Sequence, residues 1–148
     1  MKTSKLNKKG NRFMFLMNTI FIAVLILPIS NLYAQSCGDI LTADITLTAD
    51  LDCSTGGTAL KVGAHNIIID GGGFSITIGG NNTGIELYNY SGVTIKNVTV
   101  VSTNAGQGYG IRLSNSSNSF VQNNTLSGLL HGLYVSGSSY DTVIDGND

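Results

Sequence analysis

The sequence predicts an all-β solenoid, in which short strands wind into coils and successive coils stack on one another. One phrase of alternating apolar residues occurs four times, starting at residues 59, 84, 110 and 132, so the copies lie 25, 26 and 22 residues apart. Self-similarity at that period is typical of stacked repeats that do not fold alone. With 19 glycines and β-branched residues at alternate positions, the composition favours strands over helices. The four copies are Ala59-Leu60-Lys61-Val62, Gly84-Ile85-Glu86-Leu87, Gly110-Ile111-Arg112-Leu113 and Gly132-Leu133-Tyr134-Val135.

Residues 1–34 have the pattern of a secretory signal peptide. Basic residues come first, an apolar run follows from Phe13 to Ile29, and small residues near Ala34 indicate cleavage after it. An uncleaved membrane anchor and a lipid-anchored Cys37 are the alternatives. The apolar run is slightly short for a membrane span of about 20 residues. We therefore expect a secreted protein, in the periplasm, outside the cell or on its surface.

Cleavage makes the chain acidic. It removes five of the eight basic residues and none of the nine acidic ones, which leaves a net charge of −6. Lys61, Lys96 and Arg112 are the remaining basic residues. Such a chain lacks the basic patch that binds nucleic acid or anionic lipid, so we expect neither nucleic acid nor, after cleavage, a membrane as partner. The sequence leaves the oligomeric state open.

Residues 35–57 lack the repeated phrase and are expected to cap the solenoid. Ile45 and Leu47 alternate with polar residues, as in a half-buried strand. Cys37 and Cys53 are the two cysteines, and an exported protein meets an oxidising compartment, so the pattern favours a disulfide between them. Closing the loop of 15 intervening residues is worth about 3 kcal/mol on the chain-entropy estimate. A redox or metal-binding thiol pair is the alternative.

Residues 58–148 hold the repeats, which we count as about three coils. In each coil a polar corner separates the repeated phrase from a second short strand, and a further corner follows. Asn97, Asn123 and Asp145 are predicted to form a structural ladder at that further corner, because Asn tolerates left-handed backbone and can bond along the stack. The sequence ends in a turn with no recognisable closing cap. We therefore expect it to be the N-terminal part of a longer protein. In this alignment the second strands place Ile69, Ile95, Val121 and Val143 in one inward column.

These repeats resemble the right-handed parallel β-helix superfamily of pectate-lyase-like proteins, closest to members built from short parallel β-helix repeats and to the NosD-like group. The resemblance rests on residues 84–100, 110–126 and 132–147, with Ile67-Ile68-Ile69-Asp70-Gly71 in the first coil, and covers about Cys37 to Asp148. It implies the fold specifically. It implies function only weakly, because the same coils occur in lyases, hydrolases, epimerases, adhesins and accessory proteins.

The outward position of the repeated phrase gives one column of candidate binding residues. It contains Lys61, Glu86, Arg112 and Tyr134, one per coil. One interpretation is a carbohydrate-binding face, on which Tyr134 stacks against sugar rings and the charges bond to hydroxyls. The other is a surface charge ladder worth about 0–1 kcal/mol per pair. Tyr88, Tyr90 and Tyr109 are expected near the same corners, and Asp70 and Lys96 are expected to align in the second strand.

No catalytic or metal-binding group can be identified. Family lyases place several acids around calcium with an Arg or Lys as base, so the resemblance alone implies calcium as a cofactor, but no clustered acids accompany Arg112. The NosD-like resemblance implies copper. His65 and His131 are the only histidines and fall at different phases of the coil, so no metal site is assigned.

Three functions remain open. The leading hypothesis is a secreted protein that acts at a polysaccharide or cell surface, mainly by binding a polysaccharide or cell-surface glycan. The second is a polysaccharide lyase or glycoside hydrolase whose catalytic coils lie beyond residue 148. The third is a structural stalk or adhesin.

Overall fold

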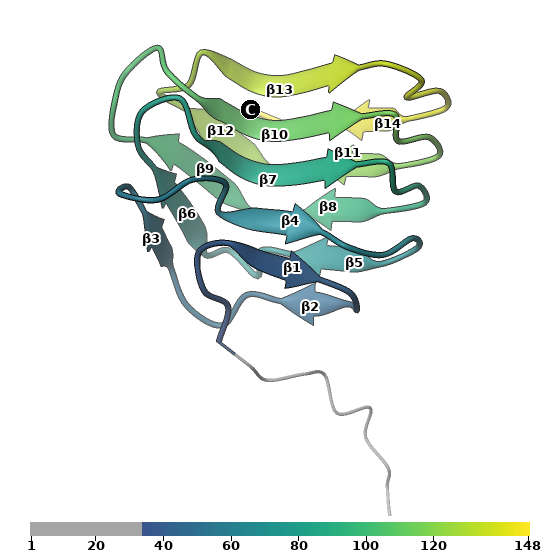
Figure 1. Cartoon of the computed structure of the whole chain (residues 1–148), viewed down its shortest axis with the longest axis horizontal. Helices are drawn as coiled ribbons and strands as arrows, with labels where there is room; N and C mark the ends of the chain where they lie inside the picture. The colour runs from purple at the N-terminus through teal and green to yellow at the C-terminus, as the bar shows by residue number, and fades with distance from the viewer. Residues whose placement is uncertain (1–33) are drawn as a thin grey trace, which may run out of the picture.

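The computed structural model describes residues 34–148 (Figure 1). The predicted signal peptide and its apolar run therefore lie almost wholly outside the described residues, as does the alternative of an uncleaved membrane anchor. Cys37, the candidate for a lipid anchor, is described, and its sulfur is bonded to that of Cys53. All regular structure in this part of the chain is β-strand. Over the same residues there is no helix with the length and apolar character needed to cross a membrane.

The strands form three parallel sheets that wrap around one core in about four turns (Figure 1). Each of the first four coils contributes one strand to each sheet in turn, and β13 and β14 then add one more strand to sheets A and B. Neighbours within a sheet therefore come from successive coils. Sheet A holds β1 (Asp39–Leu41), β4 (Leu60–Val62), β7 (Thr83–Tyr88), β10 (Tyr109–Ser114) and β13 (His131–Ser136). Sheet B holds β2 (Ile45–Thr46), β5 (Ile68–Asp70), β8 (Thr94–Lys96), β11 (Phe120–Gln122) and β14 (Val143–Asp145). Sheet C holds β3 (Leu51–Cys53), β6 (Ser75–Ile78), β9 (Thr99–Ser102) and β12 (Thr125–Ser127).

Alternation along each strand builds the core. In β10, Ile111 and Leu113 are fully buried while Arg112 between them faces out. Successive side chains of a strand point to opposite faces, so a repeated apolar-x-apolar phrase stacks its apolar residues into continuous columns. Each such side chain contributes about 1.5–3 kcal/mol on burial. The innermost side chains include Leu60, Ile69, Ile76, Ile78, Ile85, Leu87, Ile95, Val100, Ile111, Leu113 and Val121.

The segment expected to cap the solenoid forms its first turn instead. β1, β2 and β3 pair with β4, β5 and β6, so the segment adds one strand to each sheet. Leu41, Leu47 and Cys53 are buried in the same core as the repeats. The solenoid therefore has about four turns, one more than the count from the repeated phrase. The repeated phrase is absent from this turn, but the inward apolar pattern is kept.

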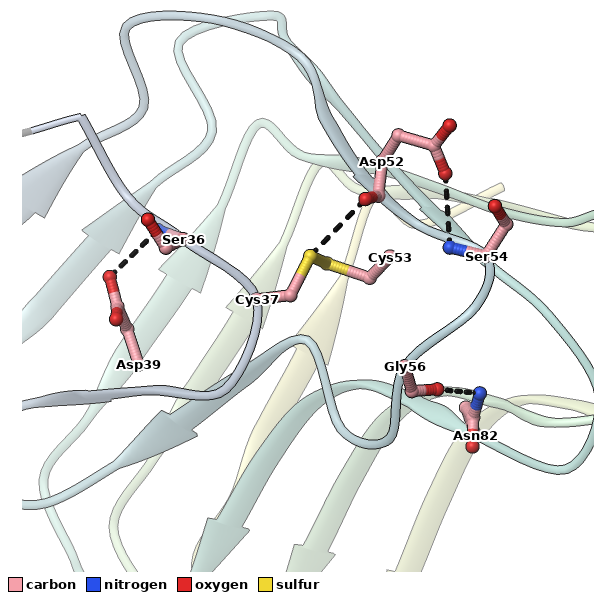
Figure 2. Close-up of a disulfide and its surroundings, with 8 residues drawn as sticks. All are labelled: Ser36, Cys37, Asp39, Asp52, Cys53, Ser54, Gly56 and Asn82. Atoms are coloured by element: carbon pink, nitrogen blue, oxygen red, sulfur yellow. Dashed lines mark hydrogen bonds between the residues drawn. A yellow bond between two sulfur atoms is a disulfide. The ribbon is translucent and has the colours of Figure 1, made fainter.

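The disulfide between Cys37 and Cys53 forms in this first turn (Figure 2). Cys37 precedes β1 and Cys53 ends β3, so the bond links the start of sheet A to the start of sheet C. Close to it, the carboxylate of Asp52 accepts a hydrogen bond from the backbone N–H of Ser54 at 3.0 Å. Hydrogen bonding from Ser54, by its side chain and then its backbone, lowers the pKa of Asp52 below its ordinary value.

Asparagine occupies the corners as predicted, with one correction. Asn97 and Asn123 follow β8 and β11 and both adopt a left-handed backbone, with φ of 54°. Asp145 does not continue this ladder: it lies in β14 and pairs with Gln122, and Ile144 rather than Val143 pairs with Val121. Gly146 takes the corner with φ of 62°, because glycine adopts this conformation without steric cost. The second strand of the last copy is thus shifted by one residue from the predicted register, whereas its repeated phrase is in register.

Candidate functional site

The four predicted binding residues form one outward column on sheet A, which we call the charged column. Lys61 is opposite Glu86 in the β4–β7 pair, Glu86 is opposite Arg112 in β7–β10, and Arg112 is opposite Tyr134 in β10–β13. The Arg112 guanidinium lies 3.5 Å from the Glu86 carboxylate, and both side chains are partly exposed, at 41% and 28%. The column is therefore reachable from solvent along its length.

Three aromatic rings gather at the upper end of this column, and we call Tyr109, His131 and Tyr134 the aromatic cluster. Tyr109 and His131 stack with ring centroids 5.4 Å apart and an interplanar angle of 17°. Tyr134 meets Tyr109 edge-on at 5.3 Å and His131 at 5.6 Å. The guanidinium carbon of Arg112 lies 5.9 Å from the centroids of both tyrosines, within the range of a cation–π interaction.

Sequence reasoning did not identify the contact between His131 and Tyr109. It placed Tyr109 only near the corners beside the outward column, and it placed His131 only at a different phase of the coil from His65. Tyr109 instead begins β10 and pairs with His131, which begins β13. The signal was present in the sequence, because each of the two residues comes directly before the glycine of the repeated phrase, at Gly110 and Gly132.

A hollow of about 420 Å³ adjoins the lower end of the charged column. Lys61 and Glu86 line it together with Tyr88 and Ile40, whose side chains are 53% and 65% exposed. Such a mixture of apolar walls and a few polar groups is typical of small-ligand sites, although this hollow is open to solvent. Tyr90 also lines it and packs edge-on against His65, with centroids 5.1 Å apart.

Sheet B carries a second charged pair, as the alignment predicted. Asp70 and Lys96 lie opposite each other in β5 and β8, with their charged atoms 3.2 Å apart. Burial raises the pKa of Asp70, but hydrogen bonds from Gly72, Asn97 and Lys96 outweigh it and leave that pKa below its ordinary value. Within residues 34–148, the cation–π contacts involve Arg112 and not Lys96, and we interpret the Asp70–Lys96 pair as a structural contact.

The described residues do not fit the calcium or copper that the resemblance implied. Calcium needs 6–8 oxygen ligands, usually with several carboxylates. Between residues 34 and 148, no three side chains of His, Cys, Asp or Glu lie close enough together to hold a metal ion. Glu86, the carboxylate nearest Arg112 in the column, is engaged by that guanidinium. We therefore derive no reaction step through a metal.

Comparison with models of known protein families assigns the chain to one family. The model of the family described as "right handed beta helix region" matches residues 34–148, which is most of the sequence, so the chain belongs to that family. Its fold is accordingly an all-β, right-handed parallel β-helix. A search of curated proteins and a search of solved structures each found no match. The fold is compatible with proteins that act on polysaccharides.

Proposed function

We propose that this protein is secreted and binds a polysaccharide or cell-surface glycan along the outward face of sheet A. The observation that carries the proposal is the aromatic cluster beside Arg112 and Glu86. Aromatic rings present a flat apolar surface to the C–H face of a sugar, while charged groups bond to its hydroxyls. The two kinds of group are adjacent on this face.

The geometry of the column supports a ligand longer than one sugar. Strands of a sheet lie about 4.8 Å apart, so the three steps from Lys61 to Tyr134 span about 14 Å. The aromatic cluster lies at one end and the hollow beside Tyr88 at the other. A short oligosaccharide laid across the strands would contact both ends and pass over Glu86 and Arg112.

Secretion rests on two observations. The disulfide between Cys37 and Cys53 is typical of proteins that fold in an oxidising compartment. The first 34 residues have the pattern of a signal peptide, which directs the chain to such a compartment. A glycan ligand is abundant at the cell surface, where an exported protein would meet it.

The test is glycan binding by the purified protein and by one matched pair of variants. Tyr134→Ala removes a ring from the cluster and should weaken binding about tenfold, since an aromatic contact contributes about 0.5–1.5 kcal/mol. Tyr140→Ala is the control, because Tyr140 is 68% exposed and lies outside the charged column. Binding is measured by calorimetry with hits from a polysaccharide panel.

The outcomes separate the three functions. Binding that Tyr134→Ala weakens and Tyr140→Ala leaves unchanged supports the proposal. Unsaturated or reducing-end products released from a polymer by the protein would favour a lyase or hydrolase. A folded protein that neither binds nor cleaves any glycan of the panel contradicts the proposal and favours a stalk or adhesin.

A further inference from the structure

Three strands of sheet C, β6, β9 and β12, present an outward face made of small neutral side chains, whereas Asp52 of the edge strand β3 carries a charge. Ile76, Ile78 and Val100 point into the core, so the residues between them face outward. The pairing of β6 with β9 and of β9 with β12 arranges these residues in two columns. One column is Ser75, Thr99 and Thr125, the other is Thr77, Val101 and Ser127, and we call the six the hydroxyl array.

The array is regular in two directions. Along each column the side chains repeat with the strand spacing, about 4.8 Å, and between columns they are two residues apart on one strand, about 6.7 Å. Threonine and valine are restricted at χ1, so their methyl and hydroxyl groups keep fixed positions on such a scaffold. We expect water bound to these groups to follow the same regular spacing.

The array is also uncharged, and most of its hydroxyls are free. β6, β9 and β12 contain no charged residue. Within residues 34–148, the Ser75 hydroxyl donates to Asp50 at 2.9 Å, whereas no hydrogen bond to another protein group is recorded for the hydroxyls of Thr77, Thr99 and Thr125. These three hydroxyls can bond to water. The charges nearest the array lie at its β3 edge, where Asp52 is opposite Thr77 and Asp50 accepts the hydrogen bond from Ser75.

We infer that the sheet C face binds ice. Water oxygens on the prism faces of ice repeat at comparable distances along two perpendicular directions. The array can therefore hold water that already matches the lattice, with methyl groups filling the gaps between hydroxyl-bonded molecules. Binding this surface would stop the growth of small ice crystals. This function is separate from glycan binding on sheet A and does not depend on it.

The experiment uses the purified full chain and follows crystal growth in a frozen solution held just below its melting point. Thr99→Lys places a charge at the centre of the array and should raise the protein concentration needed to arrest recrystallisation about tenfold, as expected for a central contact residue. Thr94→Lys is the matched control, since Thr94 is the partly exposed residue of β8 opposite Phe120 on sheet B. Circular dichroism and the melting temperature establish that each variant is folded.

Arrest of growth by the wild-type protein and by Thr94→Lys, with loss in Thr99→Lys, supports the inference. If Thr99→Lys does not fold, Thr125→Lys at the exposed end of the same column replaces it, with the same expected loss. The inference is overturned if the folded wild-type protein leaves crystal growth unchanged, or if both lysine variants lower the activity equally. It is also overturned if no variant changes the effect on ice growth. If Thr99→Lys then lowers retention on microcrystalline cellulose, the sheet C face binds a glycan and not ice.

Discussion

The outward faces of sheet A and sheet C carry different chemistry on the same stacked backbone. Sheet A exposes ionised and aromatic side chains, with Arg112 between Glu86 and Tyr134. Beyond Asp52 of its edge strand β3, sheet C exposes hydroxyl and methyl groups, with Thr99 between Ser75 and Thr125. Both faces rest on one core of Ile, Leu and Val. The solenoid thus fixes positions at about 4.8 Å intervals and leaves the choice of side chain there free, because outward residues contribute little to stability.

The same comparison explains why we do not propose a ligand site on the outward face of sheet B. Its Asp70–Lys96 pair is held by Asn97 and Gly72 at the adjoining corner, so its groups already have partners within the protein. On sheet A the aromatic rings contact one another but keep exposed surface, as the exposed His131 shows. A face whose polar groups are partly unsatisfied is better suited to a ligand.

The largest expected effect comes from the core that both faces share. Leu113→Ala empties a fully buried position under sheet A and should lower the free energy of unfolding by about 3–4 kcal/mol. Arg112→Ala, the outward neighbour on the same strand, should cost less than about 1 kcal/mol. Urea unfolding of the two variants measures the difference. Equal losses would mean that the outward residues are not free to vary.

The second-largest expected effect comes from the disulfide between Cys37 and Cys53, which joins sheet A to sheet C in the first turn. Replacing Cys37 and Cys53 by serine should lower the free energy of unfolding by about 2–3 kcal/mol, because the unfolded chain regains its loop entropy. Each coil contacts only its neighbours, so the distant aromatic cluster should keep its glycan affinity while the protein remains folded. Unfolding with and without reductant, alongside binding, measures both. A loss of affinity in the folded serine variant would show coupling along the stack.

The smallest expected effect on stability comes from the Asp70–Lys96 pair of sheet B. The pKa of Asp70 is lowered in the folded protein, so its stabilising contribution is present above its ordinary pKa of about 3.9 and is lost as the pH falls through the folded value. Asp70→Asn should cost less than about 1 kcal/mol at neutral pH and should flatten the fall in stability below about pH 4. Thermal unfolding between pH 7 and pH 3 would measure it, at about one-unit steps. Hydrogen bonds from Ser75 and Ser54 lower the pKa values of Asp50 and Asp52 as well, so part of the slope should remain.

Much of the fold could be predicted from the repeated phrase in the sequence. The period predicted the stacking, and the alternation within Gly110-Ile111-Arg112-Leu113 predicted which residues are buried. The first turn was not counted as a coil because it lacks the repeated phrase. The second strand of the last copy was placed one residue out of register because an acidic residue and a glycine both suit a corner, and only the pairing of Asp145 with Gln122 distinguishes them.

The sequence by itself determined the coil, its inward columns and the order of residues along each outward column. These depend on local alternation and on a regular repeat, both of which are visible along the chain. Only the tertiary structure decided which side chains meet across coils. Tyr109, His131 and Tyr134 belong to two strands and touch because a turn of the solenoid brings β10 beside β13. The same stacking sets the hydroxyl array, since its spacing across β6, β9 and β12 is a property of the sheet and of no single strand.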